Sequence, residues 1–264
     1  MRKQQLKDGK VKLNTESHLR NKRGETIRHG LGTATFAEYS IVDQSQVVPI
    51  PKNIPLDRAA LLACAVITGV GAVVNTAKVK PGSSVAIIGI GGVGLNAIQG
   101  AVLVGAYPII AIDRLDNKLT AAKIFGATHT INTTQQETPE KIIKELTSGR
   151  GVDYVFVTVG SATAVTQGFY ILSKQGTEVI VGIPEIMATV SLPIALLVVR
   201  GQKVMGSYMG SSRLSVDVPW LVELYQHGRI KLDELITARY PLEQINEAIE
   251  AMENGESLRN MIVF

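Results

Sequence analysis

Short apolar runs alternate with longer segments of helical periodicity through the middle of the chain. The apolar runs predict strands at 85–88, 109–112, 128–131, 152–157, 178–181 and 204–207. The segments between them predict helices at 92–104, 118–125, 139–147, 163–172 and 194–199. Because the strand runs are apolar throughout, we expect them to be buried on both faces, as in a parallel sheet. The alternation of strands and helices predicts an α/β fold with a doubly wound parallel sheet.

The segments on either side of this region follow the pattern less clearly. Ahead of the sheet we expect a strand, an extended piece and two helices, at 35–42, 47–51, 58–64 and 68–77. After residue 210 we expect two helices and a closing strand, at 219–227, 242–253 and 259–264. The chain therefore has a central α/β region with smaller elements before and after it.

A glycine-rich turn joins the first strand of the predicted sheet to its first helix. Gly89, Gly91 and Gly94 have G-x-G-x-x-G spacing, and Asp113 closes the next apolar run 19 residues later. Gly89 permits the tight turn, Gly91 lets the backbone approach a pyrophosphate, and Gly94 lets the helix lie close to the sheet. The helix N-terminus supplies free N–H groups and partial positive charge. This pattern predicts a Rossmann-type dinucleotide-binding unit, in which Asp113 accepts hydrogen bonds from the adenosine ribose.

Composition and charge limit the class of protein. The chain has 264 residues, of which 45% are apolar and 19% charged, enough for one large domain or two small ones. No apolar run reaches the roughly 18 to 20 residues that span a bilayer, so we expect no membrane association. The single cysteine excludes internal disulfides and suits a reducing, cytoplasmic compartment.

The basic charge is concentrated at the start of the chain. Residues 1–29 carry nine Lys or Arg and three Asp or Glu, a net charge of +6. The remaining residues carry 18 and 20, a net charge of −2. The basic segment has no interleaved aromatic residues of the kind that bind nucleic acid. We therefore expect residues 1–29 to form a solvated, poorly ordered arm, with no nucleic-acid partner.

Several collinear motifs resemble one enzyme family. They are LGTATFAEY at 31–39, CAVITG at 64–69, VKPG at 79–82, FGAT at 125–128, GVD at 151–153, VGIP at 181–184 and SLR at 257–259. Together with the glycine turn, Asp113 and Lys118, they resemble the zinc-type alcohol dehydrogenases of the medium-chain dehydrogenase/reductase superfamily. The resemblance extends from His29 to Phe264 and is strongest to the alcohol and glutathione-dependent formaldehyde dehydrogenase branch.

The resemblance implies a domain organisation and a cofactor. Residues 30–65 would be a remnant of a β-rich GroES-like catalytic domain, 66–209 the NAD-binding Rossmann domain, and 210–264 a segment returning to the catalytic domain. NAD is favoured over NADP because the Asp113 carboxylate repels a 2′-phosphate, an effect that Arg114 partly offsets. The cofactor-binding residues implied are Thr68, Gly89, Gly91, Gly92, Val93, Gly94, Asp113, Arg114, Lys118, Val159, Val181, Ile183 and Arg259.

The resemblance also implies roles for several of these side chains. Arg259 would bind the pyrophosphate, for which a guanidinium is a suitable bidentate donor, and Lys118 would pack near the ribose. The residues flanking the nicotinamide would be Thr68, Val93, Val159 and Ile183. Leu31 and Ile183 would line a pocket for the alcohol. From the sequence alone, packing in the hydrophobic core explains each of these apolar residues more readily than a contact with cofactor or substrate.

Cys64 falls on a catalytic zinc ligand position in this resemblance. A catalytic zinc uses three protein ligands and one open position. The family takes its other two ligands, its proton relay and its structural-zinc cysteines from a region before the start of this chain. Cys64 is the only cysteine, and His18, His29, His129 and His227 have no ligand-like spacing. We therefore expect a truncated chain that binds NAD, holds no zinc by itself and is inactive or nearly so.

Three functions remain open from the sequence. The first is an NAD-dependent zinc-type alcohol dehydrogenase, acting on an alcohol or aldehyde, whose activity is impaired in this chain. The second is a zinc-independent NAD(P)H reductase of the quinone oxidoreductase type; Cys64 and Thr68 favour the first over the second. The third is a non-catalytic nucleotide-binding module. Relatives in the family pair through sheet edges, so we expect a homo-oligomer, a dimer or tetramer, formed through residues 190–207.

Overall fold

The computed structural model describes residues 5–7, 10–12, 19–28, 30–135 and 138–264. The chain forms two compact units, residues 1–49 with Phe264 and residues 50–263, and each is described here by itself. The predicted poor order of residues 1–29 falls partly on positions outside the described residues. The predicted domain boundaries, at residues 65 and 209, stay predictions.

In the described part of the first unit the elements are short. β1 (Gln5–Lys7) pairs antiparallel with β2 (Lys10–Lys12), and two 3-10 turns follow, η1 (Gly30–Gly32) and η2 (Gln44–Gln46). The strand predicted at 35–42 is wrong: no strand forms there, and Phe36, Tyr39 and Ile41 are exposed. An alternating sequence forms a strand where a neighbouring strand takes up its backbone hydrogen bonds, and residues 35–42 have no such neighbour in the described part of this unit.

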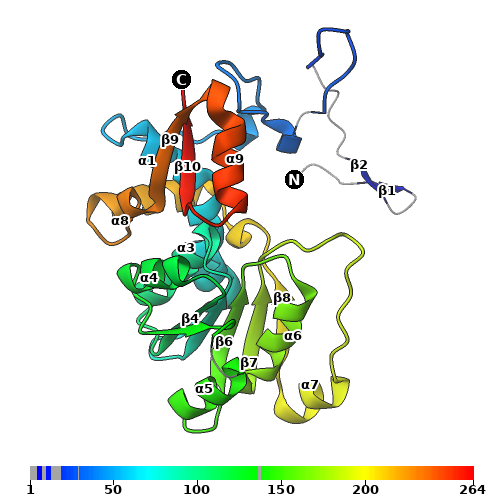
Figure 1. The fold of residues 1–264 in the computed structure, drawn as a ribbon, viewed down its shortest axis with the longest axis vertical. Coiled ribbons are helices and arrows are strands. Elements are labelled where there is room, and N and C mark those ends of the chain that lie inside the picture. Colours follow the sequence, from blue (N-terminus) through cyan, green and yellow to red (C-terminus); the bar gives the residue numbers. More distant parts are fainter. Residues whose placement is uncertain (1–4, 8–9, 13–18, 29, 136–137) are drawn as a thin grey trace. The chain divides into compact units, whose positions relative to one another are not determined.

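The second unit is organised around a six-stranded parallel sheet (Figure 1). Its strand order is β5–β4–β3–β6–β7–β8. The strands are β3 (Val85–Ile88), β4 (Ile109–Asp113), β5 (His129–Asn132), β6 (Val152–Val157), β7 (Leu172–Ile180) and β8 (Lys203–Gly206). The predicted doubly wound parallel sheet is confirmed. The chain runs outward from β3 in both directions, which creates a topological switch point between β3 and its neighbours.

Helices cover both faces of this sheet. α3 (Gly92–Leu103) and α4 (Asp116–Ile124) contact one face. The other face packs against α5 (Pro139–Leu146), α6 (Ala162–Tyr170) and α7 (Ile194–Arg200) through a core cluster that includes Ile110, Val155 and Phe169. The helix predicted at 163–172 ends at Tyr170, because the chain enters β7 at Leu172.

A continuous helical stretch from Leu56 to Ala77 precedes β3. Its segments are α1 (Leu56–Leu61), the π-helical η3 (Leu62–Val66), α2 (Ile67–Gly71) and the π-helical η4 (Ala72–Ala77). The prediction of two separate helices is wrong, because residues 65–67 are buried and helical. By length and composition this 22-residue stretch, with a mean hydropathy of 1.9, could cross a membrane, which the sequence prediction overlooked. The most apolar 18 residues of this stretch are 61% buried within the unit, as is usual for a helix in a protein core.

The C-terminal part of the second unit adds helices and a small sheet. These elements are α8 (Leu214–Gln226), η6 (Asp233–Leu235), β9 (Ile236–Pro241), η7 (Leu242–Gln244), α9 (Ile245–Glu253) and β10 (Arg259–Val263). β9 and β10 pair in parallel. β9 was not expected, because it mixes apolar, polar and charged residues and ends in proline. α8 begins ahead of the predicted residue 219 and contains Pro219 within it.

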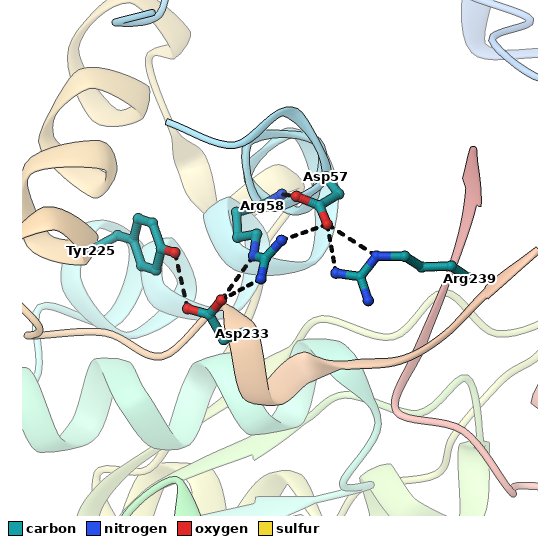
Figure 2. A network of polar contacts seen from close by, with 5 residues as sticks. All are labelled: Asp57, Arg58, Tyr225, Asp233 and Arg239. Atoms are coloured by element: carbon teal, nitrogen blue, oxygen red, sulfur yellow. Dashed lines mark hydrogen bonds and ion pairs between the residues drawn. The ribbon is translucent and has the colours of Figure 1, made fainter. Parts of the chain in front are cut away.

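A polar network joins α1 to the C-terminal elements (Figure 2). Asp57 Oδ2 lies 2.6 Å from Arg58 Nη1 and 2.6 Å from Arg239 Nη2. Arg58 Nη2 lies 2.7 Å from Asp233 Oδ1, and the Tyr225 hydroxyl donates to Asp233 Oδ2 at 2.9 Å. The Arg58 side chain, assisted by Arg239, lowers the pKa of Asp57 to about 2. The network holds α8, η6 and β9 to the long helical stretch.

Candidate functional site

The glycine turn lies at the carboxyl end of β3, where the strand order reverses. Gly89 has a φ of +91°, in the region that favours glycine. A Cβ at Gly94 would lie 2.1 Å from the Gly89 carbonyl oxygen, so α3 can approach the turn this closely only with glycine. No atom lies within 4 Å of the Cβ position of Gly91, which leaves open space beside its backbone. The turn therefore has the geometry that the G-x-G-x-x-G spacing predicts.

Arg259 lies against the N-terminus of α3. A Cβ at Gly92 would lie 2.1 Å from Arg259 Nε, so the guanidinium takes the place of a side chain there. That Nε is buried and has no hydrogen-bond partner among the described residues. Burial lowers the pKa of Arg259, and the Cys64 sulfur opposes this shift. A half-buried cation with a free, buried Nε donor, beside a helix N-terminus without a capping side chain, is suited to bind an anion.

Asp113 is held beside this turn by backbone hydrogen bonds. Its Oδ2 accepts from the Ile90 N–H at 2.6 Å. Its Oδ1 accepts from the N–H groups of Arg114 and Leu115 at 2.7 and 3.0 Å. These bonds fix the orientation of the carboxylate and leave it lone pairs for further donors. The Arg114 residue itself is exposed.

Lys118 connects this carboxylate to the C-terminal segment. It is 7% exposed, and its Nζ donates to the Ser257 carbonyl oxygen. Burial lowers the pKa of Lys118, the charge of Asp113 opposes this shift, and the charge of Arg259 adds to it. The structure therefore brings Asp113 and Lys118 together with Arg259, which is more than 140 positions further along the sequence.

A second group of predicted residues lies at the carboxyl ends of β6 and β7. A Cβ at Gly89 would lie 3.0 Å from Val159 Cβ, and one at Gly182 would lie 2.4 Å from the Val159 carbonyl carbon. Val181 is buried, whereas Val159 and Ile183 are 42% and 78% exposed. Val159 and Ile183 therefore present apolar surface at the switch point, beside the glycine turn. Val181 supports this surface from the core.

Thr68 lies on α2, which packs against α3. A Cβ at the next residue, Gly69, would lie 2.4 Å from the Val93 carbonyl oxygen, so Thr68 and Val93 are on adjoining segments. Thr68 is buried, and its hydroxyl donates to Met209 Sδ at 3.7 Å. Met209 was not identified from the sequence. The only signal for it is the Met-Gly-Ser turn after β8, η5 (Met209–Ser211), which has positive φ at all three residues.

The remaining predicted positions are those for substrate and metal. Leu31 is 77% exposed and belongs to the first unit, whereas Ile183 belongs to the second, so the alcohol pocket implied for this pair stays a prediction. Cys64 is exposed and lies in the π-helical η3. His18 and His29 are outside the described residues.

The described residues do not fit a catalytic zinc. Among them there is no group of three or more His, Cys, Asp or Glu side chains that could hold a metal ion. The charged group that interacts with Cys64 is the Arg259 guanidinium, which a divalent cation would repel. A catalytic zinc needs three protein ligands, and among the described residues only the Cys64 position is identified as one.

Comparison with known proteins identifies the family of the chain. A family model described as zinc-binding dehydrogenase matches residues 92–226, from the start of α3 to the end of α8. The chain belongs to the zinc-binding dehydrogenase family. Its sequence is 42% identical to that of an alcohol dehydrogenase class-3 of Pisum sativum over 240 aligned residues. The alignment covers 90% of this chain and 63% of the pea protein.

Solved structures of the zinc-binding dehydrogenase family show the same fold. An alcohol dehydrogenase zinc-binding domain protein of Burkholderia ambifaria matches with a TM-score of 0.86 and 35% identity, over 91% of this chain and 65% of that chain. Benzyl alcohol dehydrogenase of Acinetobacter calcoaceticus matches with a TM-score of 0.86 and 32% identity, over 92% and 68%. The chain thus spans under two thirds of the pea and Burkholderia proteins. The predicted fold class and family are confirmed.

Proposed function

We propose that this zinc-binding dehydrogenase binds NAD at the glycine turn and belongs to an alcohol–aldehyde hydride-transfer system. The observation that supports this most directly is the buried Arg259 Nε, which lies against Gly92 at the N-terminus of α3 and has no hydrogen-bond partner among the described residues. There it would bind the pyrophosphate together with the free N–H groups of α3. Asp113 would accept hydrogen bonds from both hydroxyls of the adenosine ribose, which favours NAD over NADP.

The remaining predicted residues complete this assignment. Lys118 would hold the ribose end of the site through its charge interaction with Asp113 and its hydrogen bond to the Ser257 carbonyl. Bound NAD supplies the nicotinamide carbon that exchanges a hydride with the substrate. The apolar side chains of Val93, Val159 and Ile183, with Thr68, would flank this ring and exclude water from one of its faces. Residues 66–209 would form the coenzyme domain, with 30–65 and 210–264 belonging to the catalytic domain.

We further propose that this chain alone has little or no alcohol dehydrogenase turnover. Oxidation of an alcohol requires a group that takes up or stabilises the charge of its oxygen as hydride leaves. In the described residues no set of side chains fits the metal that performs this in zinc-type dehydrogenases. The substrate class of the complete catalytic system would be a small alcohol or aldehyde.

Calorimetric titration with NAD and NADP, combined with metal analysis and activity assays, tests these proposals. We expect NAD to bind more tightly than NADP, without stoichiometric zinc and without turnover of a primary alcohol. Absence of NAD binding contradicts the coenzyme assignment. Stoichiometric zinc together with alcohol turnover contradicts the proposal that this chain alone has little or no alcohol dehydrogenase activity. Metal-free reduction of a quinone by NADPH would instead support the zinc-independent reductase.

We also propose that two copies of the chain associate through β8. β8 is an edge strand, with β7 on one side and no strand on the other among the described residues. Its free backbone groups can pair with a second copy. Exposed apolar residues lie beside it on α7, where Ile194, Val198 and Val199 are 73%, 77% and 82% exposed.

Light scattering after size-exclusion chromatography tests this association. Met205→Asp places a charge on the β8 edge and should convert a dimer to a monomer. Ile124→Asp places the same charge on an exposed apolar position of α4 and should leave the dimer intact. A monomeric parent chain, or equal effects of the two variants, contradicts the proposal.

A further inference from the structure

A second concave site lies at the opposite end of the parallel sheet from the glycine turn. It is formed at the amino ends of β6 and β7, where α5, α6 and α7 end (Figure 1). The cavity has a volume of about 200 Å³. Its lining includes Glu140, Lys144, Arg150, Tyr170 and Arg200. Nothing in the coenzyme assignment uses these residues.

The three cations of this pocket have no partner within the described residues. Lys144, Arg150 and Arg200 form no ion pair and no side-chain hydrogen bond there. Glu140, the one acid in the lining, forms no ion pair with any of them. Three like charges around one small cavity repel one another, and this repulsion decreases when an anion enters.

The carbonyl groups at the nearby helix ends are already satisfied by backbone and hydroxyl donors. The Ile143 carbonyl accepts from the N–H and hydroxyl of Thr147 at 2.9 and 2.6 Å. The Lys144 carbonyl accepts from the Gly149 N–H at 2.7 Å. The three cationic side chains are therefore not serving as caps for these carbonyls, and their donors are available to a ligand.

Two glycines of the loop between α5 and β6 line the cavity. Gly149 and Gly151 line it, with φ values of +80° and +84°. A Cβ at Gly151 would lie 2.6 Å from the Ile171 carbonyl oxygen, so a side chain cannot be added there without moving backbone. Tyr170, which is 48% exposed, supplies an aromatic wall.

We propose that this pocket binds the phosphate group of a small phosphorylated molecule. Arg150 and Arg200 can each bind phosphate oxygens in a bidentate manner, and Lys144 adds a point charge. A water molecule occupies about 30 Å³ of liquid, so the cavity has room for a phosphate and part of the organic group attached to it. That organic group would lie against the Tyr170 ring.

Amide chemical shifts in NMR titrations of the full chain test this proposal independently of NAD binding. The probes are inorganic phosphate and phenyl phosphate, each compared with sodium chloride at equal ionic strength. We expect saturable shifts at the Gly149 and Gly151 amides, with phenyl phosphate binding more tightly than inorganic phosphate. The amides of Gly91 and Gly94 report separately on the coenzyme site, so failure of one site is distinguishable from failure of the other.

Charge-removing variants identify the side chains responsible. Arg150→Gln and Arg200→Gln should each weaken both probes by roughly tenfold, the loss expected for one charge-assisted contact. Lys123→Gln removes an exposed cation of α4 outside the pocket and should have no effect. Equal shifts with sodium chloride, unchanged affinity in both Arg variants, or an equal loss in the Lys123 variant overturns the proposal. Equal affinity for the two probes overturns the role of Tyr170.

Discussion

The guanidinium of Arg259 occupies the position at which a side chain of Gly92 would begin. The distance from the Gly92 Cβ position to Arg259 Nε is 2.1 Å. The two residues are 167 positions apart, and the contact joins the first turn of α3 to the first residue of β10. At Gly92, the fourth residue of the glycine turn, a side chain would therefore have to displace the Arg259 guanidinium. Gly91, one residue earlier, faces open space instead.

The two neighbouring glycines should respond differently to alanine. Gly92→Ala displaces the buried guanidinium, so it should lower the Tm of the unliganded chain and weaken NAD binding by roughly tenfold or more. Gly91→Ala should leave the Tm unchanged, because nothing lies within 4 Å of its Cβ position, but should weaken NAD binding through closer contact with the pyrophosphate. Calorimetry of both variants, with and without NAD, measures the contrast. A normal Tm for Gly92→Ala contradicts the packing argument.

Replacement of the Asp113 carboxylate should change coenzyme choice. Asp113→Asn removes the negative charge and leaves one acceptor oxygen, so either the Ile90 N–H or the N–H groups of Arg114 and Leu115 lose their acceptor. NAD affinity should fall by roughly tenfold, and the preference for NAD over NADP should decrease. Titration with the two coenzymes checks this, with Asp116→Asn on α4 as the matched control. Unchanged NAD affinity in the Asp113 variant would falsify its assignment to the ribose.

Glu178 should make the stability of the chain depend on pH. This residue of β7 is fully buried, and neither carboxylate oxygen has a hydrogen-bond partner among the described residues. Burial raises its pKa from 4.5 to about 8. Between these values the unfolded chain releases a proton that the folded chain keeps, so stability falls as pH rises, by about 1.4 kcal/mol per pH unit.

Urea unfolding at pH 6 and pH 8 measures the contribution of Glu178. Glu178→Gln should become more stable relative to the parent chain by up to about 3 kcal/mol between these two pH values. The Gln side chain preserves the close contact with Gly168, whose Cβ position lies 2.2 Å from Glu178 Oε1. If the difference in unfolding free energy between the two proteins is the same at pH 6 and pH 8, Glu178 does not titrate as proposed.

The Asp57 network should stabilise the C-terminal segment at neutral pH. Asp57→Asn weakens the contacts with Arg58 and Arg239, at a cost of about 1 kcal/mol for partly exposed pairs. Because the folded pKa of Asp57 is about 2 and its ordinary value is 3.8, this contribution is present above about pH 4 and is lost as pH falls through this range. The difference between parent and variant in urea unfolding should therefore shrink on acidification. Glu234→Gln, at a 3.8 Å exposed pair with Lys231, is the control and should have a smaller effect.

Local sequence pattern was sufficient for the sheet and for its glycine turn. β3, β4 and β6 are short runs rich in apolar residues, so their type follows from the residues themselves. The first half of β7 (Leu172–Ile180) is mostly polar, and only its second half was expected as a strand. The same reasoning failed where pairing decides the outcome. Residues 35–42 alternate but form no strand, whereas β9, with its mixed sequence, pairs with β10. Periodicity reports which positions can be buried, but not whether a neighbour covers them.

By itself, the sequence determined the α/β fold, the glycine turn after β3 and the acid at the end of β4. The family motifs added the roles expected for Lys118, Arg259 and Cys64. Only the tertiary structure decided that Arg259 packs on Gly92, that Glu178 is buried without a partner, and that three cations share a second pocket. The physical reason is that backbone conformation at a glycine turn is set by adjacent residues, whereas charge and burial at a site depend on side chains from distant segments.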